Sequence, residues 1–206
     1  MTGWDVFFPL VMVEAPGCPE PTAAQYLRMT ARDFCKRSRA WVQALAPVIA
    51  DGVASQFTIV LDPAWQGELV RIVGATLNGK PLEVKSAAVL SRQPRPADCC
   101  GSLLDQGDGT YRIDRAPAAG GTLLMHAALM PTFTADQCAA VLSTSYPQAI
   151  ADGALGRLLA LANVPFANPI RAMDCRASYE KQLHAASNTD FLRAAPDQRR
   201  VQPSPL

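Results

Sequence analysis

The chain has 206 residues, 49% of them hydrophobic, which is enough to bury a core as one domain or as two small lobes. Its 19 basic and 18 acidic residues leave a net charge of +1, so overall charge predicts neither general nucleic-acid binding nor an acidic tail. The apolar run at residues 6–13 follows Asp5 and contains Pro9, and no Lys or Arg flanks it, so we expect no signal peptide. No stretch approaches the roughly 20 apolar residues that cross a bilayer, so we expect a soluble protein with no membrane partner.

The first strong pattern is an amphipathic segment at residues 21–46, which predicts one long helix that Pro47 ends. Its apolar residues step by three and four, the spacing of one helix face, so this face is expected to pack on other helices. Basic residues crowd the opposite face. The apolar stripe is Leu27, Ala31, Phe34, Ser38, Trp41 and Leu45, and the basic face is Arg28, Arg32, Lys36, Arg37 and Arg39.

Three interpretations of this basic face stay open: contact with solvent, with an acidic protein surface such as a neighbouring subunit, and with nucleic-acid phosphate. Aromatic residues do not interleave with the charges, as a stacking platform for single strands requires. The sequence therefore gives no support for base-specific DNA recognition.

The middle of the chain changes to a two-residue period, which predicts strands. Apolar residues alternate over residues 57–61, and a second run at residues 68–77 leads into Asn78 and Gly79 before a further apolar segment. Asn-Gly between two such runs is a strong signal of a β-hairpin.

A second strand pair is expected at residues 110–114 and 122–129, joined by a turn at residues 116–121. Residues 91–109 show little periodicity and are rich in Pro and Gly, which predicts a long surface loop. Four to six antiparallel strands would thus occupy residues 48–131.

Helical spacing returns after Pro131, and Pro147 is expected to kink or split the helix. Gly153 and Gly156 each lower intrinsic helix stability by about 1 kcal/mol, so the pair indicates a close helix crossing that offsets this loss. A last helix is predicted from Pro169, and the sequence turns polar from Asn188.

This order predicts an α+β fold, in which a helical bundle of one N-terminal and two or more C-terminal helices carries an inserted antiparallel β domain. The bundle would comprise residues 1–47 and 132–190, the insertion residues 48–131, and an extended docking tail residues 191–206. The expected bundle core includes Leu27, Phe34, Trp41, Leu158 and Tyr179.

Catalytic and metal-binding patterns are weak throughout the sequence, so we expect no enzyme, no catalytic residue, no metal site and no cofactor. His126 is expected on the polar face of its strand, and nothing in the local sequence prepares it as a base for Cys138. The acidic turn at residues 105–110 lacks the later glutamate of a calcium loop. The phosphate-binding glycine motifs are also missing.

The six cysteines have the spacing of neither a zinc site nor a disulfide framework. Cys35 and Cys175 fall within helical patterns, where a free thiol packs as a small apolar residue. Cys99 and Cys100 are adjacent. We expect structural thiols in a protein that matures in a reducing cytoplasm.

Four segments, taken in order, resemble the head-to-tail adaptor proteins of short-tailed bacteriophages. They are PGCP at residues 16–19, ARDFCKRSRAW at residues 31–41, ADGALGRLL at residues 151–159 and PFANP at residues 165–169. The likeness in layout covers most of the chain, while the β block matches in position and size alone.

The resemblance implies a structural virion protein, assembled in the host bacterial cytoplasm, that forms a dodecameric ring between the portal protein and the tail nozzle or fibres. Double-stranded DNA would pass through its lumen. In such adaptors the C-terminal segment docks on the portal and the β region faces the tail, and a polar tail would become ordered on docking. The implied portal-binding residues are Asp190, Phe191, Leu192, Arg193, Arg199, Arg200, Val201 and Leu206, and the implied nozzle or fibre contacts are Asn78, Gly79, Arg92, Arg95 and Asp98.

Two alternatives stay open beside the adaptor. One is another phage head-completion or minor tail protein. The other, from a different class, is a cytosolic enzyme or ligand-binding module built on a helical bundle. A ring complex of the purified chain with its portal protein would favour the adaptor. Failure of any portal association, together with turnover of a small substrate that mutation of Cys138 or His126 abolishes, would overturn it.

Overall fold

The computed structural model describes residues 1–49, 56–86, 101–107, 109–114 and 119–194, with side chains to residue 188. The fold is mixed α+β, and the chain forms two compact units. The first, called the helical unit, comprises Met1–Trp41, Trp65–Gly67 and Met130–Leu206. The second, called the β unit, comprises Val42–Ala64 and Glu68–Leu129.

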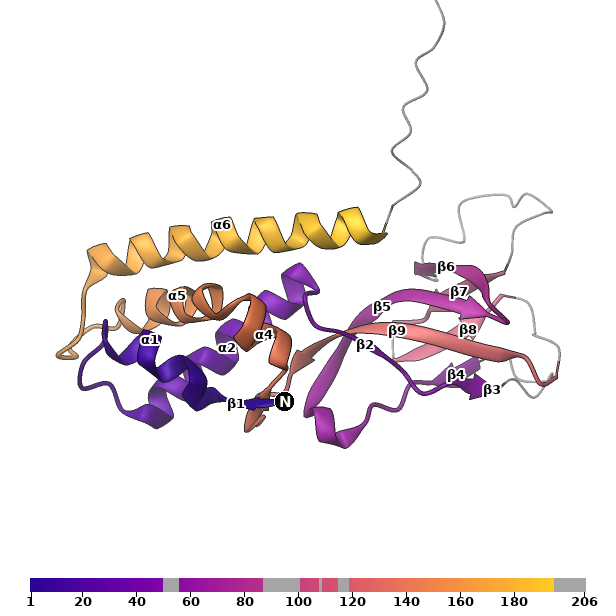
Figure 1. Ribbon diagram of the computed structural model, residues 1–206, viewed down its shortest axis with the longest axis horizontal. Coiled ribbons are helices and arrows are strands. Elements are labelled where there is room, and N and C mark those ends of the chain that lie inside the picture. Colours follow the sequence, from indigo (N-terminus) through magenta and orange to yellow (C-terminus); the bar gives the residue numbers. More distant parts are fainter. Residues whose placement is uncertain (50–55, 87–100, 108, 115–118, 195–206) are drawn as a thin grey trace, which may run out of the picture. The chain divides into compact units, whose positions relative to one another are not determined.

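The helical unit is built around α5, which lies between α6 and the N-terminal helices (Figure 1). A short two-stranded antiparallel sheet pairs β1 with β10. In the described residues of this unit the elements are β1 (Thr2–Gly3), the 3-10 helix η1 (Trp4–Phe7), α1 (Phe8–Met12), α2 (Glu20–Ser38), the end of the 3-10 helix η2 (Pro63–Trp65), β10 (Gln137–Cys138), α4 (Ala140–Ser145), α5 (Pro147–Leu158) and α6 (Pro169–Ala194).

The helix α2 ends at Ser38, so the predicted continuation of this helix to residue 46 is wrong. Arg39 takes a left-handed conformation, with φ 57°, and its N–H donates to the Cys35 carbonyl. The Ser38 hydroxyl donates to the Phe34 carbonyl at 2.7 Å, closing the last turn. Trp41 therefore lies beyond the helix, and Pro47 does not end it. Trp41 is still 1% exposed, with its ring against Gly67.

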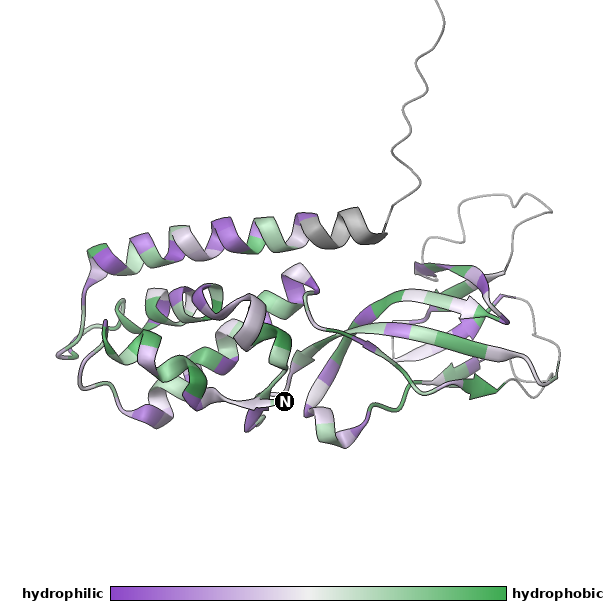
Figure 2. Ribbon diagram, in the orientation of Figure 1, coloured by the Kyte–Doolittle hydropathy of each residue, from purple (hydrophilic) through white to green (hydrophobic). Residues whose placement is uncertain are grey.

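Later helix boundaries match the sequence pattern more closely. Pro147 was expected either to kink or to split the helical region, and it splits this region into α4 and α5. The helix α6 begins at Pro169, as expected. However, α6 continues to Ala194, so residues 191–194 are helical and the prediction of an extended tail from residue 191 is wrong there. Figure 2 shows hydrophilic positions recurring along α6, while its inward face carries buried residues such as Cys175 and Leu183.

The β unit contains an eight-stranded sheet in the order β2-β9-β5-β6-β7-β8-β4, with β3 also paired to β9. Its core includes Ile72, Leu103, Tyr111 and Met125. The two longest strands, β5 and β9, run side by side (Figure 1). The strands are β2 (Val42–Ala44), β3 (Val48–Ile49), β4 (Gln56–Thr58), β5 (Gly67–Leu77), β6 (Lys80–Ser86), β7 (Ser102–Asp105), β8 (Thr110–Ile113) and β9 (Thr122–Pro131).

The hairpin at Asn78-Gly79 is confirmed, because it joins the antiparallel strands β5 and β6 and both turn residues have positive φ, 51° and 77°. The expected pairing of β8 with β9 is wrong, because β8 pairs with β4 and β7. The sheet is also not antiparallel throughout, because β6 and β7 are parallel. A long connection, residues 87–101, permits a parallel pair.

Residues 91–109 do not form one loop, because β7 lies within them. This strand has two adjacent buried leucines, Leu103 and Leu104, and is too short to show a period in the sequence. Residues 91–100 lie outside the described residues.

Candidate assembly surfaces

A polar cluster, here called the Asp33 cluster, joins α2, α5 and α6. The Tyr179 hydroxyl on α6 donates to Asp33 Oδ2 on α2 at 2.7 Å, and Arg157 Nη2 on α5 lies 3.6 Å from the same oxygen. Arg37 Nη1 and Nη2 donate to the two carboxylate oxygens of Glu180 at 2.8 and 2.6 Å. This bidentate pair joins α2 to α6 at an exposed position.

Ionisation in this cluster follows from its surroundings. Burial, with the hydrogen bond to Asp33 as a second cause, raises the pKa of Tyr179, so its hydroxyl stays a donor at neutral pH. The hydrogen bond from Arg37 lowers the pKa of Glu180, so this carboxylate stays ionised. Both shifts favour the packed arrangement of α2 and α6 at neutral pH.

A second polar contact holds α5 to α6 around Asp152, which is only 5% exposed. Its carboxylate accepts hydrogen bonds from Gln148 Nε2 at 2.7 Å, Ser178 Oγ at 2.6 Å and Gln182 Nε2 at 3.1 Å. Three neutral donors compensate part of the cost of burying a carboxylate. The contact specifies which face of α6 meets α5.

The close helix crossing predicted at Gly153 and Gly156 is confirmed. A Cβ atom at Gly153 would lie 2.5 Å from Thr30 Cγ2 on α2 and 2.7 Å from the Tyr179 ring on α6. A Cβ atom at Gly156 would lie 2.7 Å from Arg176 Cγ. Only glycine lets α5 approach both neighbours this closely, so the helical unit depends on these positions.

Part of the basic face of α2 binds other residues of its own unit, which was not among the three interpretations drawn from the sequence. Arg32 Nη1 donates to the Pro131 carbonyl at 2.6 Å, and its guanidinium lies 3.7 Å from the centre of the Phe133 ring. Arg28 Nη1 is 3.5 Å from the Phe133 carbonyl. Arg37 belongs to the Asp33 cluster. These three arginines hold structural contacts, and Phe133 is nevertheless 64% exposed.

In the β unit, the Asn78-Gly79 turn contributes to a shallow hollow that Leu77, Asn78, Lys80, Leu82 and Gly101 line. The turn is held firmly, because Asn78 Oδ1 accepts from the Thr122 N–H at 2.8 Å. The Asn78 N–H donates in turn to the Thr122 carbonyl at 2.9 Å. This turn is thus a fixed feature of the surface, whereas Arg92, Arg95 and Asp98 lie outside the described residues.

The candidate portal-binding residues divide into two groups. Asp190, Phe191, Leu192 and Arg193 form part of the backbone of α6. Arg199, Arg200, Val201 and Leu206 lie outside the described residues. The five residues expected in the bundle core are all at most 5% exposed: Leu27, Phe34, Trp41, Leu158 and Tyr179.

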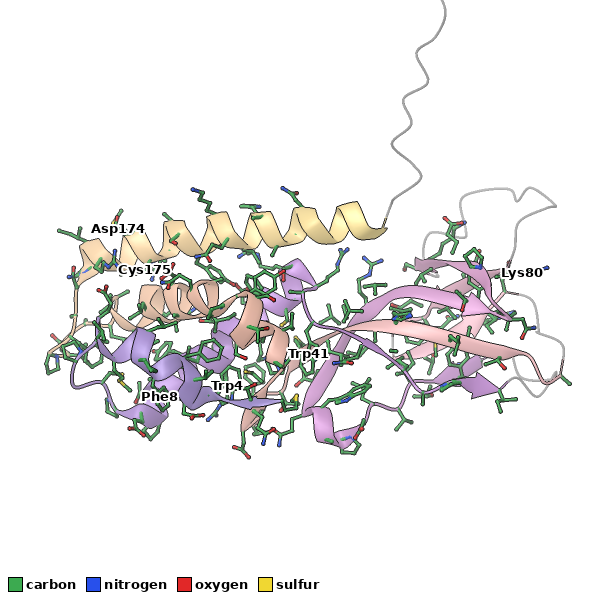
Figure 3. All side chains as sticks on the ribbon, viewed as in Figure 1. Trp4, Phe8, Trp41, Lys80, Asp174 and Cys175 are labelled. Carbon is green, nitrogen blue, oxygen red and sulfur yellow. The ribbon has the colours of Figure 1, made fainter. Side chains whose placement is uncertain are left out.

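The thiols of Cys18, Cys35, Cys138 and Cys175 are free and buried. Burial raises the pKa of Cys138 to about 11 and that of Cys35 further, so neither is a thiolate at neutral pH. On α6, Cys175 is buried and its neighbour Asp174 is exposed (Figure 3).

His126 is exposed beside buried Met125, as predicted. In the part of the chain that the structure describes, no group of three His, Cys, Asp or Glu residues could hold a metal ion. Within the same residues, no helix is both long and apolar enough for a membrane span.

Comparison with known families places the chain among phage proteins. The model of the SU10 adaptor protein family matches residues 12–204, nearly the whole chain. The chain therefore belongs to the SU10 adaptor protein family, consistent with a phage head-tail adaptor. This membership points to a structural protein of a bacteriophage. A search of curated proteins finds no match.

Two features were not predicted from the sequence. One is the exposed aromatic side chain of Phe133, and the other is the Asp33 cluster between the helices. Two signals were present in the sequence: Asp33 and Arg37 have the i, i+4 spacing of a helical ion pair, and Phe133 stands alone between Pro131 and a new helical pattern. Neither signal reveals a partner, because Glu180 is far from Arg37 along the chain and Arg32 is far from Phe133.

Proposed function

We propose that the chain is a head-to-tail adaptor that forms a ring between the portal and the tail nozzle, through which the phage genome passes. The observation that carries this proposal is the family match over residues 12–204. The ring is dodecameric, and each subunit uses two different surfaces for its two neighbours, as a closed head-to-tail ring requires. The protein acts as a structural part of the virion at the head-tail interface, without a catalytic residue, metal or cofactor.

The domain organisation proposed for this role is a helical bundle at residues 1–47 and 132–190 with the β domain inserted at residues 48–131. The division into a helical unit and a β unit supports the insertion itself, but it begins the β unit at Val42 and assigns Trp65–Gly67 and Met130 onward to the helical unit. The Asp33 cluster and the Gly153 crossing support it further, since they join one N-terminal helix to two C-terminal helices.

In the proposed ring, the segment from Asp190 to Leu206 docks on the portal and gains order there. The Asn78-Gly79 turn, with Arg92, Arg95 and Asp98, faces the tail nozzle or fibres. The subunits are only transiently close to the double-stranded DNA in the lumen. Assembly takes place in the host bacterial cytoplasm, where the reduced thiols are stable.

The experiment uses two truncated chains, one ending at Ala194 and one ending at Thr189. The full chain is expected to bind the portal protein of its own virus, giving a larger particle in size-exclusion chromatography with light scattering. Both truncated chains should retain the helical circular dichroism of the full chain but lose portal binding. If the chain ending at Ala194 binds normally and the chain ending at Thr189 does not, the docking residues lie within 190–194. Unchanged binding by both refutes the docking assignment, and a full chain without portal binding refutes the adaptor.

A further inference from the structure

Phe133 is an exposed aromatic side chain that the helical unit holds in a fixed position. One face of its ring meets the Arg32 guanidinium at 3.7 Å, and the side chain is still 64% exposed. Arg32 also donates to the Pro131 carbonyl at 2.6 Å, so one arginine fixes both the ring and the backbone that precedes it. A rigid aromatic side chain loses little conformational entropy on binding, which is a property of interface hot spots.

Gln66 fixes the same loop from the other side. Its carbonyl accepts from the Thr132 N–H at 2.8 Å, and its side-chain Oε1 accepts from the Asp136 N–H at 2.7 Å. Gln66 does this in a left-handed conformation with φ 46°, which a residue with a side chain rarely adopts. Two independent sets of contacts thus order a loop whose largest side chain faces solvent.

The N-terminal helical segment of the same unit presents a second apolar surface that is exposed among the described residues. Its buried face is Trp4, Phe7, Val11 and Ala15, each at most 4% exposed. On the outer face, Val6, Leu10 and Val13 follow each other by four and three residues and are 45%, 37% and 80% exposed. We call these three residues the outer stripe. Apolar side chains on both faces of a helical segment favour burial of both faces, and within the described residues of the unit nothing buries the outer stripe.

The surface around Phe133 is basic, and the outer stripe is flanked by acidic residues. Arg28, Arg32 and Lys36 lie at four-residue intervals on the α2 face that holds the Phe133 loop, where Asp136 is the acidic residue of the loop. Residues 1–27 contain no Lys or Arg, and Asp5 and Glu14 flank the outer stripe. Glu14 pairs with Arg171 at 3.0 Å, which leaves Asp5 as the stronger contribution.

From the exposed apolar side chains on both surfaces and the charges beside them, we infer that Phe133 of one copy docks on the outer stripe of a second copy. The contact is heterologous, because each copy offers Phe133 to one neighbour and the outer stripe to the other, and such contacts close into rings. The inference rests on the proposed adaptor ring and assigns residues to its subunit contact. The basic residues beside Phe133 and the acidic residues beside the stripe set the orientation of the two copies.

The test places the photoreactive analogue p-benzoylphenylalanine at position 133 of the full chain. Equal amounts of unlabelled and nitrogen-15-labelled protein are mixed, assembled on the portal protein and irradiated, and cross-linked peptides are identified by mass spectrometry. We expect cross-links between differently labelled copies, ending within residues 6–13. Cross-links from residue 133 to any other region, or to residue 133 of the partner copy, overturn the inference and leave the ring intact.

Substitutions give an independent measurement. Phe133→Ala and Leu10→Ser are each expected to weaken association between copies by about 30-fold, the effect of losing one hot-spot residue. Arg32→Lys keeps the charge but loses the planar group that stacks on the ring, so it should also weaken association. Val60→Ala is the matched control, since Val60 is 85% exposed in the β unit. Equal association of Phe133→Ala and Val60→Ala overturns the inference, whereas the absence of any ring refutes the proposed function as well.

Discussion

Replacing Gly153 by alanine tests whether close approach of three helices holds the helical unit together. The added methyl group would lie 2.5 Å from Thr30 Cγ2 and 2.7 and 2.9 Å from two atoms of the Tyr179 ring. Neither neighbour can move easily, because Thr30 is fully buried and the Tyr179 hydroxyl is bonded to Asp33. The substitution therefore forces helices apart or side chains out of their preferred rotamers.

The expected magnitude is a difference between two opposing effects. Overpacking of a well-packed core costs about 1–3 kcal/mol, and the two fixed neighbours favour the upper end of this range. Alanine recovers about 1 kcal/mol of helix propensity relative to glycine. We expect Gly153→Ala to lower the free energy of unfolding by about 2 kcal/mol, which moves a urea midpoint down by about 1 M.

Tryptophan fluorescence is the suitable assay, because the three tryptophans, Trp4, Trp41 and Trp65, all belong to the helical unit. Thr30→Ala removes the nearest clashing atom and should return about 1 kcal/mol to Gly153→Ala in a double-mutant cycle. Gly74→Ala is a control outside this crossing, because nothing lies within 4 Å of its added Cβ. A urea midpoint for Gly153→Ala that equals or exceeds that of the parent chain would refute the close crossing.

Three further predictions concern single side chains. Tyr179→Phe leaves Asp33 without its 2.7 Å donor and should lower the free energy of unfolding of the helical unit by about 1.5–3 kcal/mol in the same fluorescence assay; an unchanged value would show that this bond adds no stability. The hydrogen bonds from Arg37 hold the pKa of Glu180 below its ordinary value in the folded chain, so the unfolded chain binds more protons at acidic pH. The stabilisation is present above the ordinary pKa of glutamate and is lost as pH falls through the lower, folded pKa. Glu180→Gln should therefore reduce this loss of stability at acidic pH, measured by urea titrations between about pH 3 and 6, a range that spans the ordinary pKa of glutamate. A pH profile parallel to that of the parent chain would contradict the assignment. Gly79→Ala strains a residue at φ 77° and should cost about 1–2 kcal/mol, measured as faster hydrogen exchange of the β5–β6 amides, while equal exchange rates would argue against the tight hairpin.

Local patterns in the sequence predicted those elements whose determinants are local. The Asn78-Gly79 turn is encoded by two residues that tolerate positive φ, and Pro147 and Pro169 act on their own helices. The Gly153 crossing was also predictable, since a glycine inside a helix needs a compensating contact. These features required no knowledge of a distant partner.

Features that depend on distant partners were predicted poorly. The end of α2 is set by Arg39 in a left-handed conformation, which arginine seldom adopts, so the apolar period appeared to continue through Trp41. The parallel pairing of β6 with β7 depends on a long connection, and the alternation of apolar residues in a strand does not reveal the direction of that strand in the sheet. Arg32 holds Phe133 in place, although the two residues are about a hundred positions apart in the sequence.

The central claim, that the chain forms a ring on a portal, is tested most directly by electron microscopy of the purified chain mixed with the portal protein of its own virus. We expect portal particles that carry one additional ring on the side facing the tail, with the dodecameric symmetry that the resemblance to head-to-tail adaptors implies. Portal particles that remain bare at saturating concentrations of the chain would contradict it.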